Sequence, residues 1–256
     1  MIFKKYLVEP QGNVWVATSD EGLGKSLLQE RVAQVDHWFF DLDDTHTDSP
    51  AAEMARKAVR TSRLSPYWLG WVARTGPQLL TKGKGAHSES WKAYVDTFLK
   101  DPETGRFRDP KTEGELYEMF RDPESRLYKG VVDFSKELGL LREEGKKGPT
   151  AAYVTRNLAV VARQFAKHLG IDSVHAEVGD KYDKIFARRS EIEKRNGDLN
   201  YGVIGDSRED EGVVRALSGA ANVLSIQVMD RPGRRQLDGF DVAIGKDYRG
   251  LVDLMQ

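Results

Sequence analysis

From about Gly148 to the end of the chain, short apolar runs alternate with segments whose apolar residues recur at helical spacing. The runs predict strands at residues 151–154, 173–176, 201–204, 223–228 and 241–244. The segments between them predict helices at about 158–169, 182–195 and 213–217. Such alternation is typical of a parallel sheet flanked by helices, so the sequence predicts an α/β fold.

A further apolar run, at residues 37–40, ends abruptly in Asp41, Asp43 and Asp44. Polar residues also follow two of the later strands, at Thr155 and Asp206. Open parallel sheets form their ligand crevice at the carboxyl ends of the strands. If these three strands are neighbours, their polar ends meet at one edge of the sheet.

The rest of the chain divides into two stretches of different character. Residues 1–35 predict an N-terminal extension with a hairpin and a helix. Residues 48–147 predict a mainly helical insertion, with helices at about 51–60, 67–72 and 91–99. The expected catalytic core therefore comprises residues 36–47 and 148–256.

Composition excludes several classes of site. The chain has 256 residues, a formal net charge of −1 and no cysteine. It therefore has no disulfide, thiolate metal site or cysteine nucleophile. The balanced charge does not favour nucleic acid or an anionic membrane as a partner. No apolar run approaches the ~20 residues of a membrane span, and no apolar signal core follows the first residues, so we expect a cytoplasmic protein.

Clustered carboxylates repel one another and favour a cation between them. Oxygen ligands, without cysteine or a fitting histidine cluster, favour Mg²⁺. Protein-bound Mg²⁺ commonly keeps several waters and recruits substrate phosphate. The strand ends alone therefore indicate metal-assisted chemistry on a phosphate.

The same segments resemble the ordered motifs of the haloacid dehalogenase superfamily. Residues 39–45, Phe-Phe-Asp-Leu-Asp-Asp-Thr, resemble its first motif, and Thr155 resembles the second. Residues 205–210, Gly-Asp-Ser-Arg-Glu-Asp, resemble the fourth. The third would be a lysine between them, either Lys181 or Lys184, and the residues after Lys181 favour it. The resemblance spans residues 39–210 and implies a Rossmann-like parallel sheet with a helical cap inserted after the first motif.

The resemblance also implies a role for each matched residue. Asp41 would be the nucleophile, and Asp43 the acid and base that serves the leaving oxygen and then water. Thr155 would bind a phosphoryl oxygen through its hydroxyl, and Lys181 would complete the catalytic set. The metal ligands would be Asp41, Asp43 through its backbone carbonyl, Asp206 and Asp210, with Asp44 left without a role.

Four residues in or beside the motifs have two interpretations each. His46 is either a loop residue or a substrate contact. Arg156 and Asn157 follow Thr155 and could touch substrate, while Asn157 also suits the N-cap of the next helix. Asp210 could be a metal partner or only a cap of the helix that follows Asp206.

These observations predict a Mg²⁺-dependent phosphatase of a small phosphorylated metabolite, active as a monomer or a homodimer. A phosphomutase or phosphotransferase would use the same residues and return the phosphoryl group to another hydroxyl. A dehalogenase would not need the acids at positions 43, 206 and 210. A binding or assembly protein could keep the fold without the chemistry. The cap, rather than the motifs, would select the substrate.

Overall fold

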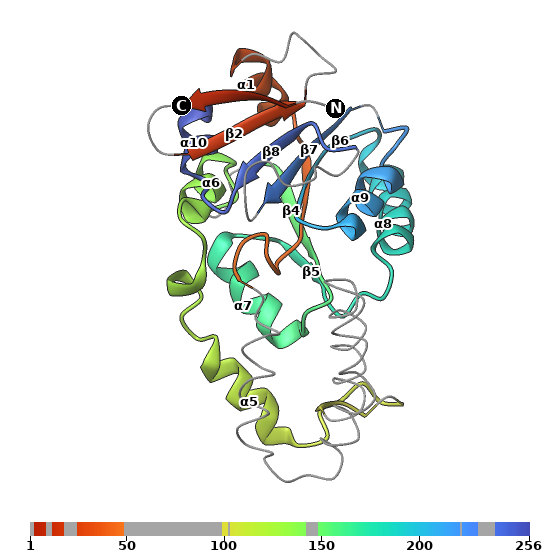
Figure 1. Ribbon diagram of the computed structural model, residues 1–256. Helices are drawn as coiled ribbons and strands as arrows, with labels where there is room; N and C mark the ends of the chain where they lie inside the picture. The colour runs from red at the N-terminus through yellow and green to blue at the C-terminus, as the bar shows by residue number, and fades with distance from the viewer. Residues whose placement is uncertain are drawn as a thin grey trace, which may run out of the picture. The chain divides into compact units, whose positions relative to one another are not determined.

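The computed structural model divides the chain into two compact units, residues 1–48 with 122–256, and residues 49–121. It describes residues 3–8, 12–17, 25–48, 99–101, 103–141, 148–220, 222–229 and 239–256 (Figure 1). Its strands are β1 (Phe3–Val8), β2 (Gly12–Ala17), β3 (His37–Phe40), β4 (Thr150–Val154), β5 (Ser173–His175), β6 (Asn200–Gly205), β7 (Asn222–Met229) and β8 (Val242–Gly245). Its helices are α1 (Lys25–Ala33), α5 (Pro110–Met119), α6 (Val131–Glu137), α7 (Ala159–Leu169), α8 (Lys181–Asn196), α9 (Arg208–Ala216) and α10 (Arg249–Met255), with a 3₁₀ turn at Glu124–Arg126.

All eight described strands form one sheet in the order β1-β2-β8-β7-β6-β3-β4-β5. The six strands from β8 to β5 are parallel, as the alternation predicts. β3 lies between β4 and β6, so the three strands that end in predicted site residues are adjacent. The expectation of a Rossmann-like parallel core is confirmed.

Alternate side chains of β3 lie on opposite faces of the sheet. Phe39 belongs to the core that packs α8 and α9 on one face, where these helices lie side by side (Figure 1). Trp38 stacks on Phe40 and meets Phe134 of α6 edge-on. Because side chains alternate along a strand, helices cover both faces and the strand is buried throughout.

The N-terminal hairpin extends this sheet. β1 pairs with β2 in antiparallel fashion, and β2 pairs with β8 in the same sense. Val14 is only 1% exposed and lies opposite Ile244. The structure therefore places the hairpin in the unit that contains the sheet, whereas the predicted division kept residues 1–35 apart from the core.

The second unit is smaller than the predicted cap of residues 48–147. Residues 122–141 fall in the first unit, where α6 packs against α10. The helices predicted at 51–60 and 67–72, and nearly all of 91–99, lie outside the described residues. Within its described part the second unit contains α5, which Asp109 caps through the Lys111 N–H.

Among the described residues, no helix has both the length and the apolar character needed to cross a bilayer.

Candidate active site

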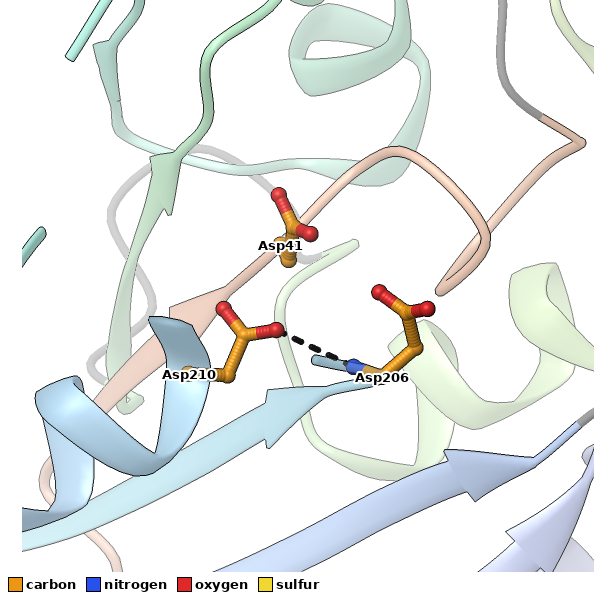
Figure 2. Close-up of side chains that lie close together, drawn as sticks. All are labelled: Asp41, Asp206 and Asp210. Carbon is orange, nitrogen blue, oxygen red and sulfur yellow. Dashed lines mark hydrogen bonds between the residues drawn. The ribbon is translucent and has the colours of Figure 1, made fainter. Parts of the chain in front are cut away.

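Three carboxyl groups meet where β3 and β6 end. Asp41 follows β3, and its N–H donates to the Ile204 carbonyl at 2.9 Å, which continues the parallel pairing to the strand end. Asp206 follows β6, and Asp210 lies on the first turn of α9 (Figure 2). One carboxylate oxygen from each of the three lies within 4.8 Å of the others. The fold thus gathers the acids predicted from separate motifs.

Lys181 is the lysine that reaches these acids. Its Nζ lies 2.9 Å from Asp41 Oδ1 and 2.7 Å from Asp210 Oδ1, and the residue is buried. Asp180 caps α8, because its side chain accepts hydrogen bonds from N–H groups of the first turn. This cap fixes the position of Lys181, the first residue of the helix. Lys184, the alternative considered from the sequence, is exposed one turn later.

Asp210 both caps its helix and faces the site. Its Oδ2 accepts hydrogen bonds from the N–H groups of Asp206 and Ser207, at 3.1 and 3.0 Å, and from the Ser207 hydroxyl at 2.7 Å. Its other oxygen holds Lys181. The two interpretations of Asp210 are therefore compatible, because each uses a different oxygen atom.

The electrostatics of the site leave negative charge unbalanced. Burial raises the pKa of Asp41 well above its usual range, Lys181 opposes this, and the carboxyl groups of Asp210, Asp43 and Asp206 add to it. For Lys181, burial lowers the pKa, but Asp210 and Asp41 together raise it above its usual value. One lysine cation thus faces several carboxylates, and a divalent cation bound through their oxygen atoms suits this donor set.

Asp43 points to a different set of partners. Asn157 donates from Nδ2 to its two oxygens at 3.0 and 3.3 Å, and the Thr155 hydroxyl donates to Oδ2 at 3.4 Å. The Asp43 side chain is outside the three-carboxylate group. The sequence-based expectation that it offers the metal only its backbone carbonyl is compatible with this arrangement.

Asn157 is one of the residues for which the sequence allows two interpretations, a substrate contact or a helix cap. Helix α7 begins at Ala159 with Leu158 at the N-cap position, so Asn157 lies one residue before the expected cap. Its Oδ1 accepts from the Leu158 N–H at 2.7 Å, which leaves Nδ2 for Asp43. Its position two residues after a predicted site threonine is the one sequence signal that could have indicated this contact.

The other two undecided residues have structural partners. Arg156 forms an ion pair with Glu209 at 2.7 Å and donates to the Gly179 carbonyl at 3.2 Å, so it connects the loops after β4 and β5 to the first turn of α9. His46 is buried, with Nδ1 2.7 Å from the Tyr153 hydroxyl. Burial lowers the pKa of His46 to about 3, so the imidazole is neutral and belongs to the core.

Comparison with known proteins gives a likeness in structure alone. No model of a protein family matches the sequence, and no curated protein matches it. A substrate-bound phosphoserine phosphatase complex superimposes with a TM-score of 0.54 at 18% identity, covering 87% of this chain and 99% of the other. Cytosolic 5′-nucleotidase IIIB bound to cytidine gives 0.53 at 12% identity, with 89% of each chain covered.

DsGPDH of Dunaliella salina gives a TM-score of 0.59 at 18% identity. The match covers 91% of this chain but 38% of that one, so this chain corresponds to one part of the larger protein. These likenesses concern the fold, and they agree with the parallel sheet. The chain therefore shares its fold, a parallel sheet flanked by helices, with a solved phosphoserine phosphatase.

Proposed function

We propose that this protein is a Mg²⁺-dependent phosphomonoester hydrolase of a small phosphorylated metabolite. The proposal depends mainly on the environment of Asp41. This buried carboxylate at a strand end forms an ion pair with Lys181 and lies close to Asp206 and Asp210. In phosphoryl transfer a protein mainly positions the reacting groups and stabilises the charge of the phosphoryl oxygens, and this group of residues is suited to both tasks.

Each of the first steps has a residue suited to it. An Asp41 oxygen attacks phosphorus, the bond from phosphorus to the ester oxygen breaks, and the phosphoryl group is transferred to Asp41. Asp43 gives its proton to the departing ester oxygen, so that an alcohol leaves. The Thr155 hydroxyl, which lies beside Asp43, would donate to a phosphoryl oxygen.

Hydrolysis then restores the carboxylates. Asp43 takes a proton from water as the water oxygen attacks phosphorus, and inorganic phosphate and the Asp41 carboxylate are released. Lys181 balances charge on Asp41 throughout. A Mg²⁺ ion held by Asp41, Asp206, Asp210 and the Asp43 carbonyl would neutralise the charge of the phosphoryl oxygens.

A panel of phosphorylated metabolites, incubated with Mg²⁺ and read as released phosphate, tests the proposal. Asp41→Asn removes the nucleophile and should abolish turnover of every ester that the unmodified protein hydrolyses. Asp133→Asn is the matched control, because that carboxylate is 62% exposed on α6. Unchanged turnover in Asp41→Asn would rule out the mechanism. Isomerised product without released phosphate would instead indicate a phosphomutase.

A further inference from the structure

Asp44, the one acid of the first motif without a role, has an unusual backbone conformation. Its φ is 56°, and Glu177 is the only other non-glycine residue with positive φ in the described part of the chain. This left-handed region is disfavoured for residues with a Cβ atom, although aspartate tolerates it better than most. Something must hold Asp44 there, directly after Asp43.

The backbone around Asp44 forms a tight turn. The N–H groups of residues 45, 46 and 47 all approach the Leu42 carbonyl, at 3.4, 3.1 and 3.4 Å. The Asp44 N–H donates to the Thr47 carbonyl at 2.8 Å. Because Asp43 lies inside this turn, the conformation of Asp44 determines where the Asp43 carbonyl and carboxyl groups point.

Lys246, 202 residues away in the sequence, is the partner of the Asp44 side chain. Its Nζ lies 2.7 Å from Asp44 Oδ1. The same atom lies 5.0 Å from the centroid of the Tyr128 ring, within the range of a cation–π contact. The Lys246 side chain is only 21% exposed. A second contact, to Asp48 at 3.4 Å, reaches a carboxylate that is 88% exposed and therefore well screened.

The loop that carries Lys246 makes a second contact with the turn. Tyr248 is buried and donates from its hydroxyl to the Thr45 carbonyl at 3.1 Å. The loop from β8 to α10 thus holds a side chain and a backbone carbonyl of two consecutive residues. This loop, near the opposite end of the sequence, therefore stabilises the turn that contains Asp43 and Asp44.

We propose that Lys246 is a positioning residue for the reaction. It holds Asp44 in the left-handed conformation and thereby sets the orientation of Asp43. This inference rests on the proposed function for its effect on catalysis. The contact itself stands on the geometry alone.

A double-mutant cycle of Lys246→Met and Asp44→Gly tests this role. Glycine adopts positive φ without strain, so Asp44→Gly should make the support unnecessary. We expect Lys246→Met alone to lower kcat on the order of tenfold with little change in KM, because a small misplacement of a reacting group is enough for such a loss. In the Asp44→Gly background the same substitution should have no further effect.

Asp48→Asn is the matched control, and it should leave kcat unchanged. It removes the charge of the exposed partner of Lys246 but keeps an oxygen that can accept from the Tyr128 hydroxyl, which lies 2.8 Å from Asp48 Oδ1. Equal losses from Lys246→Met in both backgrounds, or no loss in either, would overturn the proposal. The same cycle measured by thermal unfolding reports on the contact without any substrate. If the unmodified protein hydrolyses no ester, the proposed function fails, while the unfolding cycle still shows whether Lys246 acts through Asp44.

Discussion

Among single residues, Asn157 helps to orient the Asp43 carboxyl group, because the hydrogen bonds of the Asn157 amide fix which of its two ends faces Asp43. The Asn157 oxygen is engaged by the Leu158 N–H at 2.7 Å, so the amide nitrogen must face Asp43, which it meets at 3.0 and 3.3 Å. An amide orients the carboxyl group without adding a charge. Asp43 can therefore exchange a proton while it stays in place.

Asn157→Ala should lower activity in a way that depends on the leaving group. Alkyl phosphates need the proton from Asp43, and we expect their kcat to fall on the order of tenfold or more, within the range that general acids contribute. Aryl phosphates with acidic phenols leave without that proton and should lose little. Turnover of both ester classes measures the difference.

Asn222→Ala provides the control for this comparison, because Asn222 is exposed at the start of β7 and bonds only Asn200 among the contacts described for its side chain. Equal losses on alkyl and aryl esters in Asn157→Ala would show that Asn157 supports the fold rather than Asp43.

Residue-level prediction succeeds where a residue belongs to a local motif. Asp41 and Asp206 could be named because each follows a strand that the apolar pattern reveals. Asp210 could be named because it completes the segment that resembles the fourth motif, and the structure brings the three together. The pairing of Lys246 with Asp44 could not be predicted, because it joins positions 202 residues apart and neither end has a local signal. Side-chain pairs of this kind depend on the tertiary fold.

At the scale of elements, the junction of β6 and α9 depends on a residue with no side chain. A Cβ atom at Gly205 would lie 2.2 Å from Asp210 Cγ, far inside van der Waals contact. Asp210 cannot move away freely, because it caps α9 and holds Lys181. The close approach of β6 to α9 is thus what brings Asp210 to Asp41.

Gly205→Ala should therefore displace Asp210 and loosen its contact with Lys181. Overpacking of this kind costs about 1–3 kcal/mol of stability, and we expect a lower melting temperature together with weaker Mg²⁺-dependent turnover. Gly114→Ala in α5 is the control, since nothing lies within 4 Å of its added Cβ. If both variants melt and react like the unmodified protein, the junction is looser than the structure indicates.

The elements that the sequence predicts best are those with strong periodicity. α7 buries one clear stripe and ends at Gly170, whose φ of 70° suits glycine, so its extent follows from the pattern. α6 and α10 have seven residues each, too few for a helical period to stand out. They are helical because they pack against each other beside the sheet.

In the sheet as a whole, the N-terminal hairpin covers the β8 edge of the parallel strands. β2 covers the side of β8 that β7 leaves open, and Val14 is buried there. Deleting residues 1–17 would expose the backbone donors and acceptors of β8 and the apolar surface under Val14. We expect a loss of at least about 2 kcal/mol of stability and increased aggregation.

Thermal unfolding and light scattering of the deletion variant measure both effects. Substituting Val14 by alanine in the full chain, a smaller change at the same position, should lower the melting temperature less. A deletion variant that melts at the original temperature and stays monodisperse would mean that the hairpin contributes nothing to the sheet.

The class of the sheet could be predicted from the sequence, but its strand order could not. Alternating strands and helices indicate a parallel sheet, whereas the order β8-β7-β6-β3-β4-β5 depends on which helices cross which face. The attachment of the hairpin to β8 joins the two ends of the sequence and has no local signal. Substrate choice is expected to reside in the inserted residues, which the motifs do not describe.

Chemical trapping can show whether Asp41 accepts the phosphoryl group. Borohydride reduces an aspartyl-phosphate to homoserine, which peptide mass mapping can locate after quenching during turnover with Mg²⁺ and a hydrolysed ester. We expect homoserine at position 41 in the unmodified protein, and none there in Asp41→Asn. Phosphate release that continues with Asp41 unmodified in the trapped sample, or trapping at another carboxylate, would contradict it.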